Sequence, residues 1–281
     1  MLVFFVPKRL GVEQYGYWQL YTLYTSYVGF FHLGWCDGVY LRYGGQDYHE
    51  LEKPVFVTQF WMLTAFEFFI TAGLGVYGFC IVPEAEKGFI LAMMGVCALL
   101  LIPRTYLGFV LQFTNRIKEY AAITMLERVI YFVLVTALVL GGVQDYRLLL
   151  AADLIGKAVG LVVAVCRCRD IVFGRMVPFR SGLSEAGKNI NVGFKLMIAN
   201  IASLLIVGIV RMTIENKWGV ATFGKVSLTM SVSNLLMVFI SAVSIILFPT
   251  LRRTSDDKLA GMYDFMRTSI MTVLLGLLIF Y

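Results

Sequence analysis

Long runs of apolar residues, separated by short polar turns, make up most of the chain. A bilayer core requires roughly 20 consecutive apolar residues for each helix that crosses it. By that criterion the sequence predicts eight full spans, at about residues 17–36, 56–82, 89–113, 120–142, 147–167, 191–213, 219–248 and 260–281. Residues 1–7 are interpreted as the last turns of a ninth, truncated helix. Because the turns are short, consecutive helices are expected to be antiparallel neighbours.

The composition excludes a soluble domain. Of the 281 residues, 59% are hydrophobic and only 15% are charged, which predicts an all-α polytopic membrane protein. The net charge of +6 comes from Lys and Arg residues spread singly through the turns, so nucleic-acid binding is not expected. Cys166-x-Cys168 lacks the spacing of a zinc or redox site, and no metal or cofactor is expected. The expected partner is the lipid bilayer.

The basic residues predict an orientation, because cytoplasmic loops carry an excess of Lys and Arg. Counted on alternating sides, one side has twelve, namely Arg42, Lys53, Arg116, Lys118, Arg167, Arg169, Arg175, Arg180, Lys188, Arg252, Arg253 and Lys258. The other side has five, namely Lys8, Arg9, Lys87, Arg147 and Lys217. The first set is therefore predicted to be cytoplasmic.

A weak internal repeat indicates two lobes. The pattern Gly11-Val12-x-x-Tyr15-Gly16-x-x-x-Leu20 returns 208 residues later as Gly219-Val220-x-x-Phe223-Gly224-x-x-x-Leu228. This offset predicts six helices per repeat. We expect a first lobe over 1–167 with its first helix truncated, a cytoplasmic linker over 168–190, and a partial second lobe over 191–281. The chain is accordingly expected to be a fragment of a longer protein.

Several ionisable residues fall inside the predicted spans, where each costs at least ~2.5 kcal/mol unless it is paired or wetted. The basic ones are Arg104, Arg128, Lys157, Lys195, Arg211 and Lys225, and the acidic ones are Glu67, Glu127, Asp153 and Glu215. The excess of two positive charges favours a cationic cavity. Lys195 and Lys225 lie near helix ends, however, where they can reach the interface.

Spacing predicts three ion pairs among them. Arg104 and Glu127 fall at equal depth in a helical hairpin. Asp153 with Lys157, and Arg211 with Glu215, are one helical turn apart. Next to the second pair, Gly156-x-x-x-Gly160 predicts a close helix contact. Each pair has a simpler interpretation as structural glue between helices, and that alternative stays open.

Tyrosines cluster in the span at 17–36. Most fit an aromatic belt at the membrane interface, but Tyr21 and Tyr24 lie deeper than a belt requires. Their hydroxyl groups need a polar partner, and an aromatic wall with hydroxyl tips is suited to a sugar in a wet cavity.

Three stretches resemble polysaccharide transporters of the Wzx flippase type, in the multidrug/oligosaccharidyl-lipid/polysaccharide exporter superfamily. They are Leu10-Gly11-Val12-Glu13-Gln14-Tyr15-Gly16-Tyr17-Trp18, the exit from Asp37-Gly38 to Arg42-Tyr43-Gly44-Gly45, and Phe248-Pro249. The resemblance implies two six-helix lobes around a cationic cavity. It also implies that the cargo is an undecaprenyl-diphosphate-linked oligosaccharide, such as an O-antigen unit, with polysaccharide polymerase and glycosyltransferases as further partners.

On this hypothesis Arg42, Arg128 and Arg211 bind the diphosphate in turn, because guanidinium groups hold phosphate oxygens bidentately. The alternative is that Arg42 only anchors a helix in lipid headgroups and Arg211 only bridges Glu215.

Three other functions compete with this hypothesis. A multidrug or cation exporter of the same superfamily would favour unpaired carboxylates, whereas here every acid has a plausible basic neighbour. A membrane enzyme of glycan assembly would need a catalytic domain larger than the longest loop of about 23 residues, so the chain is not expected to be an enzyme. A membrane scaffold would not need charges in mid-membrane.

Overall fold

The computed structural model describes residues 2–253, 261, 263–264, 267–268 and 271. Within this part the chain is helical and contains no strands. The elements are α1 (Leu2–Leu10), α2 (Val12–Ser26), the 3-10 helix η1 (Val28–Phe30), α3 (Trp35–Tyr43), α4 (Lys53–Cys80), α5 (Ala85–Phe113), α6 (Ile117–Leu140), α7 (Tyr146–Arg167), α8 (Arg169–Val172) and α9 (Phe179–Arg253). The chain divides into two compact units, 1–228 and 229–281, and the contacts discussed below lie in the first.

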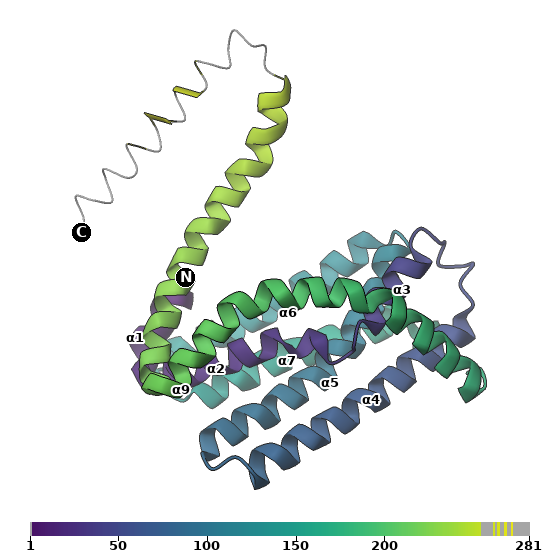
Figure 1. The fold of residues 1–281 in the computed structure, drawn as a ribbon, viewed down its shortest axis with the longest axis horizontal. Helices are drawn as coiled ribbons and strands as arrows, with labels where there is room; N and C mark the ends of the chain where they lie inside the picture. Colours follow the sequence, from purple (N-terminus) through teal and green to yellow (C-terminus); the bar gives the residue numbers. More distant parts are fainter. Residues whose placement is uncertain (1, 254–260, 262, 265–266, 269–270, 272–281) are drawn as a thin grey trace. The chain divides into compact units, whose positions relative to one another are not determined.

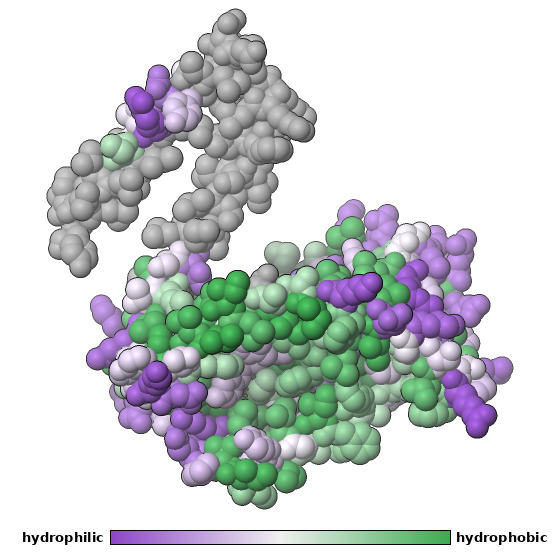
Figure 2. Space-filling view, in the orientation of Figure 1, coloured by the Kyte–Doolittle hydropathy of each residue, from purple (hydrophilic) through white to green (hydrophobic). Residues whose placement is uncertain are grey.

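Four helices, α4 to α7, are long and apolar enough to cross a membrane, as predicted. A fifth crossing is obtained if the two parts of α9 on either side of a 49° bend, 179–202 and 204–234, are taken as one span. In Figure 2 apolar side chains cover the middle of the helices in the first unit, and hydrophilic side chains gather at their two ends. The protein is therefore an all-α polytopic membrane protein.

The span predicted at 17–36 is broken in the structure. It consists of α2 and α3, separated by η1 and a turn in which Leu33 and Gly34 have positive φ angles of 52° and 79°. The two pieces still run from one end of the bundle to the other. Gln14 near the start of α2 accepts a hydrogen bond from the backbone N–H of Tyr146 at the start of α7, and the N–H of Gly45 after α3 donates to Phe113 at the end of α5.

The predicted linker at 168–190 is mostly helical. Residues 169–172 form α8, and α9 already begins at Phe179, twelve residues before the predicted start of the next span at 191. The predicted span at 219–248 lies within α9, although side chains are described only to Asn234. Most of the last predicted span, 260–281, lies outside the described residues.

Helix α9 runs alongside α2 and α3 in the first unit (Figure 1), and small residues allow the close approach. A Cβ atom on Gly34 would lie 2.6 Å from the carbonyl carbon of Gly193, and one on Gly38 would overlap the backbone of Asn189. Such contacts between small residues are the usual means of close helix packing in membranes.

The internal repeat has a geometric counterpart. Gly11 has φ 80° and ψ 166°, and Gly219, its equivalent at the offset of 208, has φ 78° and ψ 172°. Each glycine breaks the helical backbone at the first residue of its repeated segment.

The two repeated segments also cross each other reciprocally. A Cβ atom on Gly16 would overlap the carbonyl oxygen of Val220, and one on Gly224 would lie 3.0 Å from the carbonyl oxygen of Val12. Because these pairs exchange under the repeat offset, the contact has approximate two-fold symmetry. We call it the repeat crossing.

Candidate functional site

Arg211 of α9 lies beside the repeat crossing. Its guanidinium donates hydrogen bonds to Oε1 of Gln19 on α2, at 3.2 Å, and to Oγ of Ser227, at 3.0 Å. The same group lies over the ring of Phe223, 5.1 Å from its centroid. Gln19 and Ser227 are equivalent under the repeat offset. Arg211 therefore sits between matching positions of the two repeats.

This arginine has no carboxylate partner within salt-bridge distance in the described part of the chain. Both hydrogen-bond acceptors are neutral, and the buried Nε atom has no partner there. The predicted pair of Arg211 with Glu215 is therefore wrong. Glu215 instead forms an ion pair with Lys87 at the start of α5, with 2.6 Å between Nζ and Oε1.

The predicted pair of Arg104 with Glu127 is confirmed, with 3.0 Å between Nη2 of the arginine and Oε2 of the carboxylate. Arg104 also donates to the hydroxyl of Thr124 at 2.9 Å. The glycine pair on α7 packs here as predicted, because a Cβ atom on Gly160 would lie 3.1 Å from Oε2 of Glu127. These residues form a compensated, tightly packed ion pair between α5, α6 and α7.

The predicted pair of Asp153 with Lys157 is also confirmed. Asp153 accepts a second hydrogen bond from the hydroxyl of Tyr21, at 2.7 Å. Tyr21 is only 2% exposed, so in this conformation its hydroxyl is used inside the protein and does not face a wet cavity. Tyr24 is half-buried and packs against the buried apolar cluster to which Tyr21 belongs. The predicted sugar-facing role of Tyr21 is thus not available in this state.

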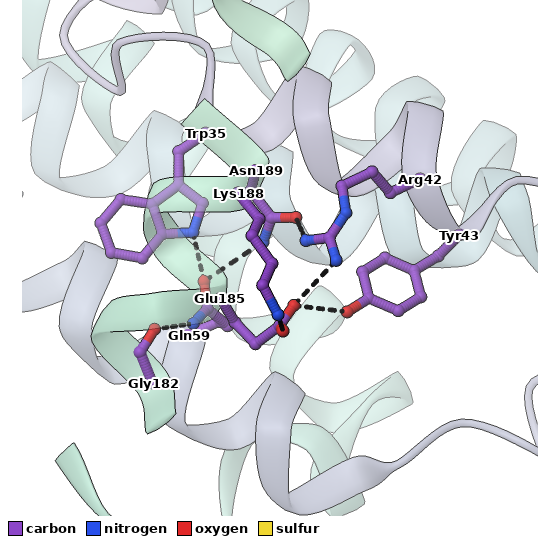
Figure 3. Close-up of polar contacts among 8 residues, drawn as sticks. All are labelled: Trp35, Arg42, Tyr43, Gln59, Gly182, Glu185, Lys188 and Asn189. Atoms are coloured by element: carbon purple, nitrogen blue, oxygen red, sulfur yellow. Dashed lines mark hydrogen bonds and ion pairs between the residues drawn. The ribbon is translucent and has the colours of Figure 1, made fainter. Parts of the chain in front are cut away.

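Arg42 belongs to a polar network at the other end of the bundle (Figure 3). It donates to Asn189 at 2.5 Å and forms a salt bridge with Glu185 at 2.9 Å, and both partners lie on α9. The adjacent pocket of about 470 Å³ is lined by Glu50 and Glu52 as well as Arg42 and Glu185. With three carboxylates and one guanidinium among its charged lining residues, this pocket does not suit a diphosphate.

The network continues through side chains that the sequence interpretation missed. Gln59 of α4 accepts from the indole N–H of Trp35 at 2.6 Å and donates to the carbonyl oxygen of Gly182, also at 2.6 Å (Figure 3). It also accepts from the side-chain amide of Asn189 at 3.3 Å. The sequence did contain a sign of this network, because a glutamine such as Gln59 within an apolar run needs internal hydrogen-bond partners.

Two ionisable residues differ from their predicted surroundings. Arg128 is exposed on α6, forms no ion pair within the described part of the chain, and lies next to the exposed apolar residues Val129 and Phe132. Glu67 is fully buried, and within the described residues neither of its carboxyl oxygens has a hydrogen-bond partner. The prediction that every acid has a basic neighbour is therefore wrong for Glu67.

Asp170 of α8 lies at the end of the bundle whose turns carry most of the basic residues. It forms a salt bridge with Lys53 of α4 at 2.6 Å and accepts a hydrogen bond from the hydroxyl of Tyr48 at 2.5 Å. Partial burial acts to raise the pKa of Asp170, but the hydrogen bonds from Lys53 and Tyr48 outweigh it and the pKa lies below its usual value.

The repeat offset could have identified Gln19 and Ser227 as a matched polar pair, since both lie at the same position of the repeated pattern. It could not have identified Arg211 as their partner, because that contact depends on how α9 crosses α2. The chain matches no family model, no curated protein and no solved structure.

Proposed function

We propose that the chain belongs to a transporter that flips a polyprenyl-diphosphate-linked oligosaccharide across the bacterial inner membrane, and that Arg211 receives the diphosphate. One observation carries the proposal: a guanidinium on the long apolar helix α9, between two repeats, with neutral acceptors and no acidic partner among the described residues. An uncompensated cation in a membrane protein's apolar part is costly, which makes it a candidate for binding an anion.

The chemistry of the cargo fits this residue. A diphosphate presents several anionic oxygens, and a guanidinium can hold two of them at once while staying charged when partly desolvated. Gln19 and Ser227 hold the arginine by hydrogen bonds from opposite repeats, at 3.2 and 3.0 Å. A movement of one repeat relative to the other would break one of these bonds and free the guanidinium for phosphate.

The sequence predicts that Arg42, Arg128 and Arg211 bind the diphosphate in turn, and their contacts in the structure differ. Arg42 is already bound to Glu185 and Asn189, so its use would require that network to open. Arg128 is exposed and has no such constraint, and it remains part of the proposal. Lys157 and Arg104 are neutralised by their acidic partners and are assigned a structural role.

Binding of undecaprenyl diphosphate to the chain in lipid nanodiscs tests the central residue. We expect binding to be lost in Arg211→Gln, which keeps a hydrogen-bonding side chain but removes the charge, and to be partly retained in Arg211→Lys. Arg180→Gln is the matched control, because Arg180 is an exposed arginine of the same helix. Unchanged binding by Arg211→Gln would contradict the assignment of Arg211.

Transport is tested in cells that supply a lipid-linked oligosaccharide. Loss of surface glycan with accumulation of the lipid-linked precursor is expected for Arg211→Gln, with wild-type display for Arg180→Gln. Normal display in a stably expressed Arg211→Gln variant would leave a cation exporter as the better proposal. That second candidate is favoured by one observation, the buried carboxyl of Glu67, which has no hydrogen-bond partner among the residues that the structure describes.

A further inference from the structure

Glu67 lies at the middle of the 28-residue helix α4, at the depth where water is most fully excluded. Its side chain is 0% exposed, and both carboxyl oxygens lack a hydrogen-bond partner within the described part of the chain. Burying a carboxylate with neither a cation nor a donor costs several kcal/mol. The surroundings therefore accommodate the neutral acid.

The neighbouring structure is the break between α2 and α3. Trp35, the first residue of α3, donates its indole N–H to Gln59 of α4, about two turns before Glu67, and Cys36 follows Trp35 in the first turn of α3. Cys36 belongs to the same buried apolar cluster as Val28 of η1 and Leu63, one turn before Glu67. The carboxyl thus lies in the apolar core that covers the broken part of the crossing.

Helix α5 supplies no charge at this level. Contacts of Gly78 with Gly88 and of Thr71 with Gly95 fix the antiparallel register of α4 and α5, and this register puts the apolar stretch 98–102 opposite Glu67. The buried residues Ala98 and Ile102 from this stretch belong to the same cluster.

Charged groups on the other packed elements are engaged elsewhere. Arg104 pairs with Glu127 at 3.0 Å and Lys53 with Asp170 at 2.6 Å, and Oδ2 of Asp37 lies 4.0 Å from Nε2 of the His32 ring beside the break. None of them is within salt-bridge distance of Glu67 in the described structure, so a proton is the simplest group that neutralises the carboxyl.

We propose that Glu67 is a proton-binding site, in which the carboxyl holds a proton in the conformation described and releases it to water when the break between α2 and α3 opens. The O–H bond breaks, the proton goes to water, and the carboxylate that remains is hydrated. Broken helices are common where membrane transporters bind small ions, because backbone there can face a water-filled cavity.

The break is suited to such an opening. Leu33 has a φ of 52°, a conformation that a residue with a side chain seldom adopts, and Gly34 follows with 79°. The helical series of backbone hydrogen bonds is also interrupted in this turn, since the N–H of Gly34 donates at 3.1 Å to the ring of His32 instead of to a backbone carbonyl. Opening here disrupts fewer backbone hydrogen bonds than opening within α4 or α5.

The inference does not depend on the cargo. Glu67 can bind a proton whichever cargo the protein carries, so failure of the Arg211 experiments leaves this inference standing. Conversely, its own failure leaves diphosphate binding at Arg211 untouched.

Infrared spectroscopy of the chain in lipid nanodiscs at neutral pH tests whether Glu67 holds a proton. We expect a carbonyl band of a buried carboxylic acid that shifts in D2O and is lost in Glu67→Gln but kept in Glu50→Gln, an exposed loop control. Glu67→Gln should fold normally, because glutamine matches the neutral acid in size. An unchanged band, or a Glu67→Gln protein that does not fold, would overturn the proposal.

Alkylation of Cys36 tests whether proton release is linked to opening of the break. The buried thiol is followed with a membrane-permeant maleimide after Cys80, Cys97, Cys166 and Cys168 are replaced by alanine. As the pH rises, labelling should become several-fold faster with Glu67 than in the same background with Glu67→Gln. Comparing the two at each pH cancels the ionisation of the thiol itself, and equal rates throughout would contradict the link.

Discussion

Arg104 and Arg211 are both arginines inside the membrane part of the chain, yet their surroundings differ in kind. Arg104 meets the buried carboxylate of Glu127 at 3.0 Å, in a contact closed off by Gly160. Arg211 meets the neutral acceptors Gln19 and Ser227 at the repeat crossing. The first charge is cancelled where it lies, and the second is held in place without being cancelled.

This difference separates structural glue from a candidate binding site. Removing one member of a buried ion pair leaves the other charge stranded, so such residues are required for folding. Removing a cation that has no acidic partner strands no charge. The same substitution should therefore affect folding at one arginine and ligand binding at the other.

The largest effect is expected for Arg104→Met, which strands the Glu127 carboxylate among α5, α6 and α7. The free energy of unfolding should fall by ~3–5 kcal/mol, measured by titrating the folded protein with SDS in mixed micelles. The double variant Arg104→Met with Glu127→Met should recover most of this loss, because neither charge then remains buried.

Exchanging the two charges should rescue less well than neutralising both. Gly160 leaves room for a glutamate at position 127 but not for the longer arginine, since the carboxylate already lies 3.1 Å from where a Cβ on Gly160 would be. If Arg104→Met alone unfolds no more readily than the unsubstituted protein, the pair does not stabilise the fold.

A smaller effect is expected at the start of α5, where Lys87 pairs with both Glu215 and Glu84. Glu215 is 4% exposed, whereas the side chain of Glu84 is 61% exposed. Lys87→Met should therefore destabilise the fold by roughly 1–3 kcal/mol through the stranded Glu215, and Glu84→Gln should have no measurable effect. Equal effects of the two substitutions in the same SDS titration would contradict the pairing.

The sequence predicted what depends on local spacing. Residues one turn apart on α7, Asp153 and Lys157, must lie side by side if the helix forms, and the apolar runs of α4 to α7 needed only length. The Arg104 pair also followed from the sequence, because a short turn fixes the register of a helical hairpin.

Prediction from the sequence failed where a contact depends on long-range packing. Arg211 and Glu215 are equally well spaced, but Lys87 and Gln19 from distant parts of the chain compete for them and prevail. The break after Ser26 was missed because residues 27–34 are as apolar as the helices around them, and only Gly29 and Gly34 mark it.

A still smaller effect is expected from the surface pair of Asp170 with Lys53. The pKa of Asp170 lies below its usual value, so the folded state is favoured by the ionised carboxylate above that usual value. This stabilisation should be lost as the pH falls through the lowered pKa, and the melting temperature should drop accordingly. Asp170→Asn should reduce that part of the pH dependence. Because the Asp170 side chain is 39% exposed, the contribution should stay below ~1 kcal/mol.

The smallest effect on folding is expected for Arg211→Met, which is the direct counterpart of Arg104→Met. The substitution removes two hydrogen bonds to neutral groups, but it also relieves the cost of a cation held in the membrane, and these changes oppose each other. In the SDS titration the midpoint should stay within about 1 kcal/mol of the unsubstituted protein, in contrast to Arg104→Met. Gln19 keeps its hydrogen bond to the Tyr15 hydroxyl at 2.7 Å, so only one of its polar contacts is lost. A loss as large as that of Arg104→Met would mean that Arg211 holds the two repeats together, and its assignment as a binding residue would have to be withdrawn.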